Sequence, residues 1–446
     1  MSGIAELLLN LGFTVSGSDL KETPVTLRLA GLGAKISLGH AAANVHGAQV
    51  AVTSSAVAPK NVEVVEAHRL GIPVIPRAEM LAELMRLKFS VAVAGAHGKT
   101  TVTSMIAVML TEAGLDPTAV IGGRLDVFGS SARLGKGELM VAEADESDKS
   151  FLMLLPSIAV VTNIDREHLD HYRDFEEIKG AFVSFMNKTP FYGAVIACAD
   201  EPWRQTLEAI RPRLRRRLVT YGLEPGAAVT AVSIQPNGFF PTFQVQENGR
   251  PLLSVRLSVP GRHNVQNALA ALSVGLELGL TPEQMRRGLE RFQGADRRFQ
   301  VKFECNGMTV VDDYGHHPAE IRATLEAARA RRPARIWAVF QPHRYTRTQL
   351  LMDEFASAFE GVERVEILDI YPAGEAPIPG VSAERLAERM RACGCTAARY
   401  APSEADLIRD LVEQIRPGTL ILTIGAGSVW RVADALASEL RAPVHK

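Results

Sequence analysis

The chain has 446 residues, 47% of them hydrophobic and 22% charged, and its 49 basic residues nearly balance its 50 acidic ones. Such a length favours about three domains over one hydrophobic core, and a net charge of −1 gives no overall field that would attract nucleic acid or a membrane surface. The four cysteines lack the spacing of a disulfide framework, and every apolar run ends well before the ~20 residues of a membrane span. We therefore expect a soluble, cytoplasmic protein with no nucleic-acid or membrane partner.

Short runs rich in valine, isoleucine and alanine alternate with longer stretches of helical periodicity, which is typical of parallel sheets covered by helices. The sequence therefore predicts the α/β class. In chain order, the expected strands are residues 49–52, 90–94, 139–142, 158–162, 194–197, 336–340, 364–368 and 420–424. A helical stretch at 78–87 and a glycine- and arginine-rich joint at 293–298 suggest boundaries between three domains, at 1–86, 87–296 and 297–446.

A glycine-rich loop follows the expected strand at 90–94 and opens a helical pattern. Its residues are Gly95, Ala96, His97, Gly98, Lys99, Thr100 and Thr101. The glycines let backbone N–H groups close around phosphate oxygens, Lys99 has the reach for the β- and γ-phosphates, and Thr100 offers a hydroxyl to magnesium. Val93 stands where the longer phosphate-loop pattern has glycine, so the loop is a shortened variant. The order of strand, loop and helix favours ATP and Mg²⁺ binding over a chance Gly-Lys-Thr turn.

Polar residues also follow the next two expected strands. Glu143 opens an acidic cluster that ends at Asp148, and the segment 162–170 carries His168. An acidic turn alone is usually a solvated helix start, and a lone histidine is more often structural than catalytic. However, the carboxyl ends of parallel strands are where such sheets bind ligands, and magnesium needs only a few hard oxygen ligands. Three successive strand ends therefore predict one site.

These residues resemble the Mur ligases, the ATP-dependent enzymes that build the peptide of bacterial cell-wall precursors, and the related folylpolyglutamate synthetases. The matching segments are 95–101, 143–151, 162–170, 261–267, 297–299, 312–318 and 341–347. The resemblance implies a Rossmann-like N-terminal domain, a central P-loop ATPase-type parallel sheet and a Rossmann-like C-terminal domain. It also implies that L-alanine is joined to the carboxylate of UDP-N-acetylmuramate through an acyl phosphate, in peptidoglycan precursor synthesis.

The resemblance assigns roles residue by residue. Thr100, Glu143 and His168 are expected to hold magnesium. Besides the glycine-rich loop, the expected nucleotide-binding residues are His263, Asn267, Arg298, Asp313 and Tyr314. The expected catalytic residues are Lys99, His168, Arg298, His316, Arg344 and Arg347. Arg298 is expected to reach the γ-phosphate when domains close, and the last two form a guanidinium pair suited to the alanine carboxylate or the acyl phosphate. Without the family, His263 and Asn267 would be a helix cap and a surface polar group, and 343–347 a surface turn.

The first domain departs most from the family pattern. Other members begin with a strand and a glycine-rich turn ahead of a segment like Met1–Glu6, and we expect that first strand to be missing here. Because the turn binds the UDP pyrophosphate, UDP binding is expected to be weakened if Met1 is the true start. A misassigned start or a clipped sequence is favoured over a natural loss of the strand. Two alternatives stay open: a ligase that recycles murein tripeptide, and an ATP-binding but inactive member. The chain is expected to be a monomer or a homodimer.

Overall fold

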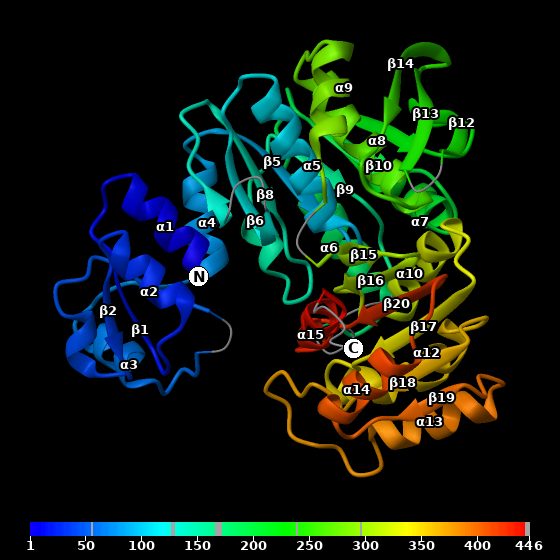
Figure 1. Cartoon of the computed structure of the whole chain (residues 1–446). Coiled ribbons are helices and arrows are strands. Elements are labelled where there is room, and N and C mark those ends of the chain that lie inside the picture. The colour runs from blue at the N-terminus through cyan, green and yellow to red at the C-terminus, as the bar shows by residue number, and fades with distance from the viewer. Residues whose placement is uncertain (55–56, 126–129, 166–171, 238–239, 295–296, 442–446) are drawn as a thin grey trace. The chain divides into compact units, whose positions relative to one another are not determined.

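The computed structural model describes residues 1–54, 57–125, 130–165, 172–237, 240–294 and 297–441 (Figure 1). Contacts divide the chain into two compact units. Unit 1 comprises Met1–Ser233, Phe243–Val255 and Gln266–Phe292, and unit 2 comprises Ile234–Thr242, Arg256–Val265 and Gln293–Lys446. Both units contain parallel sheets with helices between the strands, so the predicted α/β class is confirmed. Among the described helices, none combines the length and the apolar character that crossing a bilayer demands.

The first part of unit 1 holds two small parallel sheets. Strand β1 (Ser16–Asp19) pairs with β2 (Lys35–Leu38), and β3 (Ala51–Thr53) pairs with β4 (Val74–Pro76). The helices here are α1 (Ser2–Asn10), α2 (Pro24–Gly31), α3 (Val62–Arg69) and α4 (Arg77–Met85). Helix α2 begins at a capping box in which Thr23 and Thr26 satisfy each other's backbone amides. The described part of this region thus holds two strand pairs instead of one continuous sheet.

The central sheet has ten strands in the order β14-β13-β12-β11-β10-β9-β5-β8-β6-β7. Their bounds are β5 (Phe89–Ala94), β6 (Thr118–Leu125), β7 (Ser130–Arg133), β8 (Leu139–Glu143), β9 (Ile158–Val161), β10 (Ala194–Cys198), β11 (Leu218–Gly222), β12 (Val229–Asn237), β13 (Phe240–Glu247) and β14 (Arg250–Arg256). The helices that accompany the sheet are α5 (Lys99–Glu112), α6 (Phe175–Asn187), α7 (Trp203–Ile210), α8 (Arg262–Glu277) and α9 (Pro282–Arg291). Each strand expected from the sequence in this region is present, its ends shifted by a residue at most.

The register of three adjacent strands decides where the glycine-rich loop lies. Strand β5 runs parallel to β8 on one side and to β9 on the other, with Val93 opposite Glu143 and Ala94 opposite Val161. Helix α5 packs behind them, and its residues from Thr101 to Leu110 are all buried. Because parallel strands end at the same edge of a sheet, the segments that follow β5, β8 and β9 emerge together.

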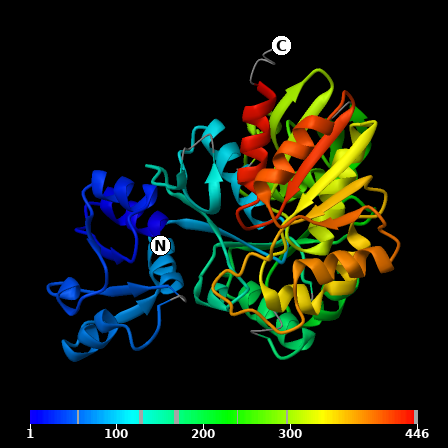
Figure 2. The ribbon, with the colours of Figure 1, turned by 60° about the horizontal axis from the view of Figure 1, so that its bottom comes forward.

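Unit 2 is built on a six-stranded sheet in the order β15-β16-β20-β17-β18-β19. Its strands are β15 (Gln300–Cys305), β16 (Met308–Asp313), β17 (Arg335–Phe340), β18 (Arg364–Ile367), β19 (Ala398–Tyr400) and β20 (Thr419–Ile424). Its helices are α10 (Pro318–Ala330), α11 (Tyr345–Leu350), α12 (Met352–Ala358), α13 (Ala383–Ala392), α14 (Glu404–Gln414) and α15 (Trp430–Arg441). Figure 2 shows these strands in yellow to red beside the red helix α15.

Both faces of this second sheet are buried. Along β17, Ile336, Ala338 and Phe340 belong to one apolar cluster, whereas Trp337 and Val339 belong to another. Side chains alternate between the two faces of a strand, so a continuous apolar run is needed when helices cover both faces. This requirement explains why the sequence of β17 could be recognised as a buried parallel strand.

Candidate functional site

The glycine-rich loop joins β5 to α5. Gly98 is the N-cap of α5 with a φ of +80°, and within the described part of the chain no side chain caps this helix start. A Cβ on Gly95 would lie 2.1 Å from Thr162 Oγ1, and one on Gly98 would lie 2.7 Å from Asn267 Oδ1. Only glycine therefore fits at these two positions. A helix start approached by a bare backbone is a ready site for phosphate oxygens, so the loop fits the nucleotide predicted for it.

The segment after β9 braces this loop. Asn163 holds both backbone groups of His97, because its Oδ1 accepts from His97 N (2.8 Å) and its Nδ2 donates to His97 O (3.0 Å). Thr162 Oγ1 donates to the same carbonyl (2.6 Å), and His97 Nε2 lies 3.6 Å from Asp165 Oδ2. Sequence reasoning placed this segment at the site but gave Thr162 and Asn163 no role. Their position directly after a strand beside the loop is the signal that pointed to them.

Lys99 is held inside the loop by a carboxylate that sequence reasoning did not single out. Its Nζ lies 2.9 Å from Glu146 Oε1 and donates to Gly95 O at 2.7 Å. The side chains are 15% and 4% exposed, so the ion pair is largely removed from water. Burial by itself lowers the pKa of Lys99, but Glu146 and Glu143 outweigh it and hold that pKa above its usual value. The lysine therefore carries a full positive charge where a phosphate would bind.

The predicted magnesium ligands are placed only in part. Glu143 ends β8 directly opposite Val93, and Thr100 is the second residue of α5, so oxygen donors lie on both sides of the loop. His168 lies outside the described residues. Among the residues that are described, no group of three or more His, Cys, Asp or Glu could hold a metal. A hydroxyl and a carboxylate are the hard donors that Mg²⁺ takes when phosphates complete its coordination, so this pair fits the predicted ion.

The start of helix α8 carries the two predicted adenine-binding residues. Asn267 meets Gly98 of the loop, as described above, and His263 packs its ring against Gly261, where a Cβ would lie 2.5 Å from Cε1. Burial lowers the pKa of His263, although Asp313 opposes this shift. Next to Asn267, Gln266 Nε2 donates to Asp200 Oδ2 at 2.6 Å. Asp200 also accepts the backbone amides that follow β11, so this buried carboxylate ties α8 to the central sheet.

In unit 2, the predicted Arg298 lies over the ring of Tyr314, and the predicted Asp313 holds the turn that carries this tyrosine. The guanidinium of Arg298 lies 5.2 Å from the Tyr314 ring centroid, and its Nη1 is 3.4 Å from Glu320 Oε1. Asp313 is buried and accepts from Phe299 N, Gly315 N and Thr324 Oγ1 at 2.8, 2.8 and 3.1 Å. The carboxylate of Asp313 therefore fixes the turn that carries Tyr314.

A histidine pair lies next to this turn. The rings of His316 and His343 have centroids 5.8 Å apart, and His343 stacks on Tyr371. Burial lowers the pKa of His316 to about 3 and that of His343 to about 4; Glu320 only partly offsets the first shift, and Arg347 reinforces both. Arg347 Nη1 lies 3.5 Å from His343 Nδ1. Unit 2 therefore brings the predicted His316 and Arg347 together with two residues that were not predicted.

Arg344 is the second member of the predicted guanidinium pair. It precedes α11 with a φ of +72°, and its Nη1 lies 4.0 Å from Glu375 Oε1. Glu375 also accepts from the Thr346 backbone and hydroxyl, at 3.1 and 2.7 Å. This carboxylate fixes the start of α11 and neutralises part of the positive charge there. Neither Glu375 nor Tyr371 could be linked to the segment 343–347 from the sequence, because they lie more than 20 residues away along the chain.

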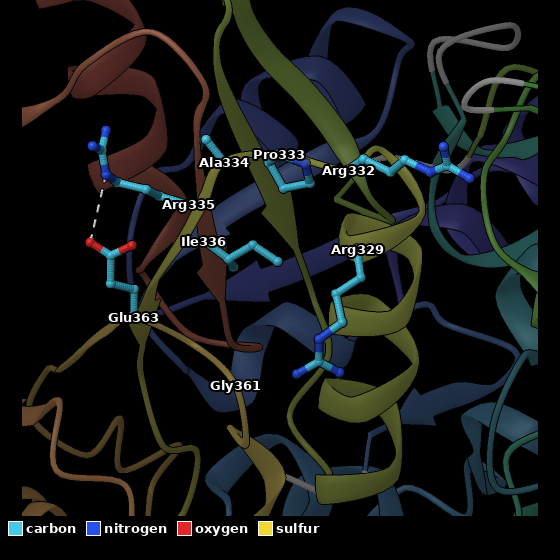
Figure 3. Close-up of a pocket in the computed structure, with 8 residues that line it drawn as sticks. All are labelled: Arg329, Arg332, Pro333, Ala334, Arg335, Ile336, Gly361 and Glu363. Atoms are coloured by element: carbon cyan, nitrogen blue, oxygen red, sulfur yellow. Dashed lines mark ion pairs between the residues drawn. The ribbon is translucent and has the colours of Figure 1, made fainter.

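A cleft of about 250 Å³ elsewhere in unit 2 is a separate feature (Figure 3). It lies at the start of β17, beside Arg335 and Ile336, whereas His343 and Arg344 follow the end of the same strand, about 20 Å away. Figure 3 shows its three guanidinium groups pointing in different directions, and only Nε of Arg335 lies near Glu363, 3.7 Å from Oε1. Diverging charges do not form a binding site for one anion, so this cleft is not part of the candidate site.

Three family models match the chain. They are the Mur ligase family catalytic domain at residues 1–89, the Mur ligase middle domain at 93–275 and the Mur ligase glutamate ligase domain at 297–427. A UDP-N-acetylmuramate--L-alanine ligase of Solibacter usitatus is 52% identical over 442 residues, covering 99% of this chain and 93% of the relative. A protein of the same name from Anaeromyxobacter dehalogenans is 55% identical over 440 residues, covering 99% of this chain and 95% of the relative.

Solved structures of similar ligases also match nearly the whole chain. A UDP-N-acetylmuramate-alanine ligase from Thermotoga maritima matches with a TM-score of 0.83 and 27% identity, over 99% of this chain and 96% of that one. A murein peptide ligase from Psychrobacter arcticus matches with a TM-score of 0.71 and 24% identity, over 100% of this chain and 97% of that one. The second likeness is one of fold alone.

Proposed function

The chain belongs to the Mur ligase family, and from that premise we propose that it joins L-alanine to UDP-N-acetylmuramate with ATP, in peptidoglycan precursor synthesis. The observation that carries this proposal is the 52–55% identity, over nearly the whole chain, to ligases of that name. The chain is an ATP-dependent ligase, and its glycine-rich loop, with a largely buried, charged lysine, supplies the chemistry that an ATP site requires.

Phosphoryl transfer is the first step of the proposed reaction. A carboxylate oxygen of UDP-N-acetylmuramate attacks the γ-phosphorus, and ADP leaves with the bridging oxygen. We propose that the first amides of α5 and Lys99 hold the phosphates, and that His263 and Asn267 hold the adenine. Bound magnesium supplies positive charge to the phosphate oxygens, and Thr100, Glu143 and His168 are its proposed ligands. Arg298 is proposed to stabilise the charge that develops on the transferred group.

Amide formation is the second step. The alanine amine attacks the acyl carbon of the acyl phosphate, and inorganic phosphate leaves. We propose that Arg344 and Arg347 bind the alanine carboxylate or the acyl phosphate, because guanidinium groups match planar anions. The lowered pKa values of His316 and His343 keep both rings neutral at pH 7. A neutral imidazole can accept a hydrogen bond from the alanine ammonium, so these rings suit the amine side of the reaction. Asp313 and Tyr314, which border the alanine side, keep their proposed role in binding the nucleotide.

Identity favours L-alanine as the acceptor over murein tripeptide. The relatives at 52–55% identity are named for L-alanine, whereas two murein peptide ligases of known structure are 24% and 28% identical to this chain. An inactive ATP-binding member is disfavoured because Lys99, Thr100 and Glu143 all lie at adjoining strand ends.

We further propose that the chain has domains at 1–86, 87–296 and 297–446, that it is a monomer or a homodimer, and that it acts in the cytoplasm. Mass spectrometry of the product formed from UDP-N-acetylmuramate, L-alanine and ATP tests the main proposal.

A further inference from the structure

We propose that Glu146 holds Lys99 in the nucleotide-free chain, and that nucleotide binding exchanges this carboxylate for the β- and γ-phosphates. Glu146 is then a positioning residue that acts through Lys99 and sets how tightly the loop takes a nucleotide. The inference rests on the proposed function, since it concerns the phosphate loop of the proposed ATP site. It adds a residue to which neither the family pattern quoted above nor the comparisons assign a role.

Three oxygen atoms accept the hydrogen bonds that the Lys99 ammonium group donates. Lys99 Nζ has Glu146 Oε1 at 2.9 Å, Gly95 O at 2.7 Å and Ala96 O at 3.4 Å. An ammonium group has three N–H donors, so these three oxygens take up its full capacity. A phosphate oxygen that binds Lys99 must therefore displace one of them. The carboxylate is the partner that resembles phosphate in charge, so it is the partner that a phosphate replaces.

The backbone around Glu146 is fixed, whereas Lys99 has a flexible stem. Tyr172 Oη donates to Glu146 O at 2.6 Å, and Lys149 N donates to the same carbonyl at 3.2 Å. The preceding Asp145 accepts from the Ser147 amide and hydroxyl at 3.0 and 2.7 Å. This turn leaves the Glu146 backbone little freedom, so the lysine side chain is the part that moves during the exchange.

The negative charge of Glu146 predicts whether its neutralisation raises or lowers the affinity for nucleotide. Glu146 is only 3% exposed, and a buried carboxylate that loses its cation repels incoming phosphate. Neutralising it removes both the competitor for Lys99 and this repulsion. Glu146→Gln keeps the size and shape of the side chain, so we expect the Kd for ADP to fall on the order of tenfold, as expected for removal of one charge contact at a partly buried site. If Glu146 merely oriented Lys99 toward the phosphates, Glu146→Gln would raise the Kd for ADP.

The test is calorimetric titration of the full chain with ADP, both in EDTA and with Mg²⁺. The matched control is Asp148→Asn, because Asp148 belongs to the same acidic segment but is exposed and accepts from Ser150 N. We expect Glu146→Gln to bind ADP more tightly in EDTA and Asp148→Asn to match the wild type. Unchanged or weaker binding by Glu146→Gln overturns the inference. If the wild type itself does not bind ADP under either condition, the proposed function fails instead, so the two failures are distinguishable.

A second measurement does not depend on nucleotide or on turnover. Acetic anhydride modifies only a neutral amine that it can reach, so a largely buried ammonium held by a carboxylate reacts slowly. Mass spectrometry is expected to show that Lys99 of the wild type is acetylated at least about tenfold more slowly than the exposed Lys60. In Glu146→Gln, the acetylation rates of the two lysines are expected to lie closer together. Equal rates at both lysines in the wild type would contradict the proposed ion pair even if Glu146→Gln failed to fold.

Discussion

His343 stacks on Tyr371, with the ring centroids 5.5 Å apart and the ring planes inclined by only 9°. Backbone hydrogen bonds join the same two segments, because Arg344 N donates to Tyr371 O and Tyr371 N donates to Pro342 O, each at 2.8 Å. The loop that begins at Tyr371 therefore sets the position of the ring that faces His316 and Arg347. A residue far along the chain thus supports the proposed amine side of the reaction.

Removal of the Tyr371 ring should weaken the use of L-alanine more than the binding of nucleotide. We expect Tyr371→Ala to raise the KM for L-alanine by roughly fivefold, because an aromatic stack contributes about 1 kcal/mol. Tyr371→Phe keeps the stack and should stay near wild type. Steady-state kinetics with varied alanine measures both variants, with the Kd for ADP as the reference. Equal losses in the Ala and Phe variants would show that the stack is not the cause.

Substitution of Gly98 should weaken nucleotide binding for a steric reason. In Gly98→Ala the new Cβ would lie 2.7 Å from Asn267 Oδ1 at a φ of +80°. Gly114→Ala is the control, because Gly114 has the same φ of +80° but nothing within 4 Å of its added Cβ. Both variants should lose about 1 kcal/mol of stability through backbone strain, but only Gly98→Ala should raise the Kd for ADP by about tenfold or more. Parallel behaviour of the two variants would remove the steric argument.

Arg298 should matter for turnover and little for ADP binding. We expect Arg298→Ala to lower kcat by about 100-fold or more, because a guanidinium at a transferred phosphoryl group acts mainly in the transition state. The same substitution at Arg332, which is exposed at the cleft of Figure 3, controls for a lost surface charge. Rates of phosphate release and calorimetry with ADP give the two quantities. Full turnover by Arg298→Ala would exclude the proposed role.

The partly buried histidines of unit 2, His316 and His343, should make folding sensitive to mild acid. The pKa of His316 is about 3 and that of His343 about 4 in the folded chain, against about 6.5 when unfolded. Above pH ~6.5 neither state binds the proton, so their stabilising contribution is complete. As the pH falls below ~6.5 toward these folded values, only the unfolded chain gains protons, and stability is lost. Each pH unit in this window removes up to about 1.4 kcal/mol per histidine.

Urea unfolding between pH 4.5 and 7 tests this dependence. The His316→Asn variant should lose less stability than the wild type on going from pH 6.5 to pH 4.5, because it lacks one of the two histidines whose protonation favours the unfolded chain. His68→Asn, at an exposed position of α3, should follow the wild-type slope. Apart from Glu320, which lies 3.7 Å from His316 Nδ1, the carboxylates keep their surroundings in all three proteins, so the comparison isolates the His316 imidazole and its partner. Identical slopes for wild type and His316→Asn would contradict the assigned burial.

Sequence patterns over a few neighbouring residues predicted the buried strand β5 and the glycine-rich loop after it. The run from Phe89 to Ala94 is continuously apolar because both faces of β5 are covered, and the glycines after it are required by steric limits at Gly95 and Gly98. The class of fold and the loop could therefore be predicted. The ion pair between Lys99 and Glu146 could not be predicted, since the segment 143–148 has four acidic residues and the sequence does not show which of them the turn directs at Lys99.

Long-range packing accounts for what the sequence did not reveal. Tyr371 reaches His343 only because the segments after β17 and β18 run side by side. Asp313 accepts a hydrogen bond from Phe299 N, which no local pattern connects to it. Asp200 likewise anchors α8 from a distant strand end. The predicted ligand His168 lies outside the described residues, so its role stays a proposal.

The most direct test of the proposed reaction measures ATP-dependent phosphate release with UDP-N-acetylmuramate and each of three acceptors: L-alanine, murein tripeptide and no amine. Mass spectrometry of the same mixtures identifies the product. We predict stoichiometric phosphate release with L-alanine, with a product heavier than UDP-N-acetylmuramate by one alanine residue, and little release with the tripeptide or without amine. Release with the tripeptide alone, or no release in any mixture, would contradict the assignment of this chain as an L-alanine-adding ligase.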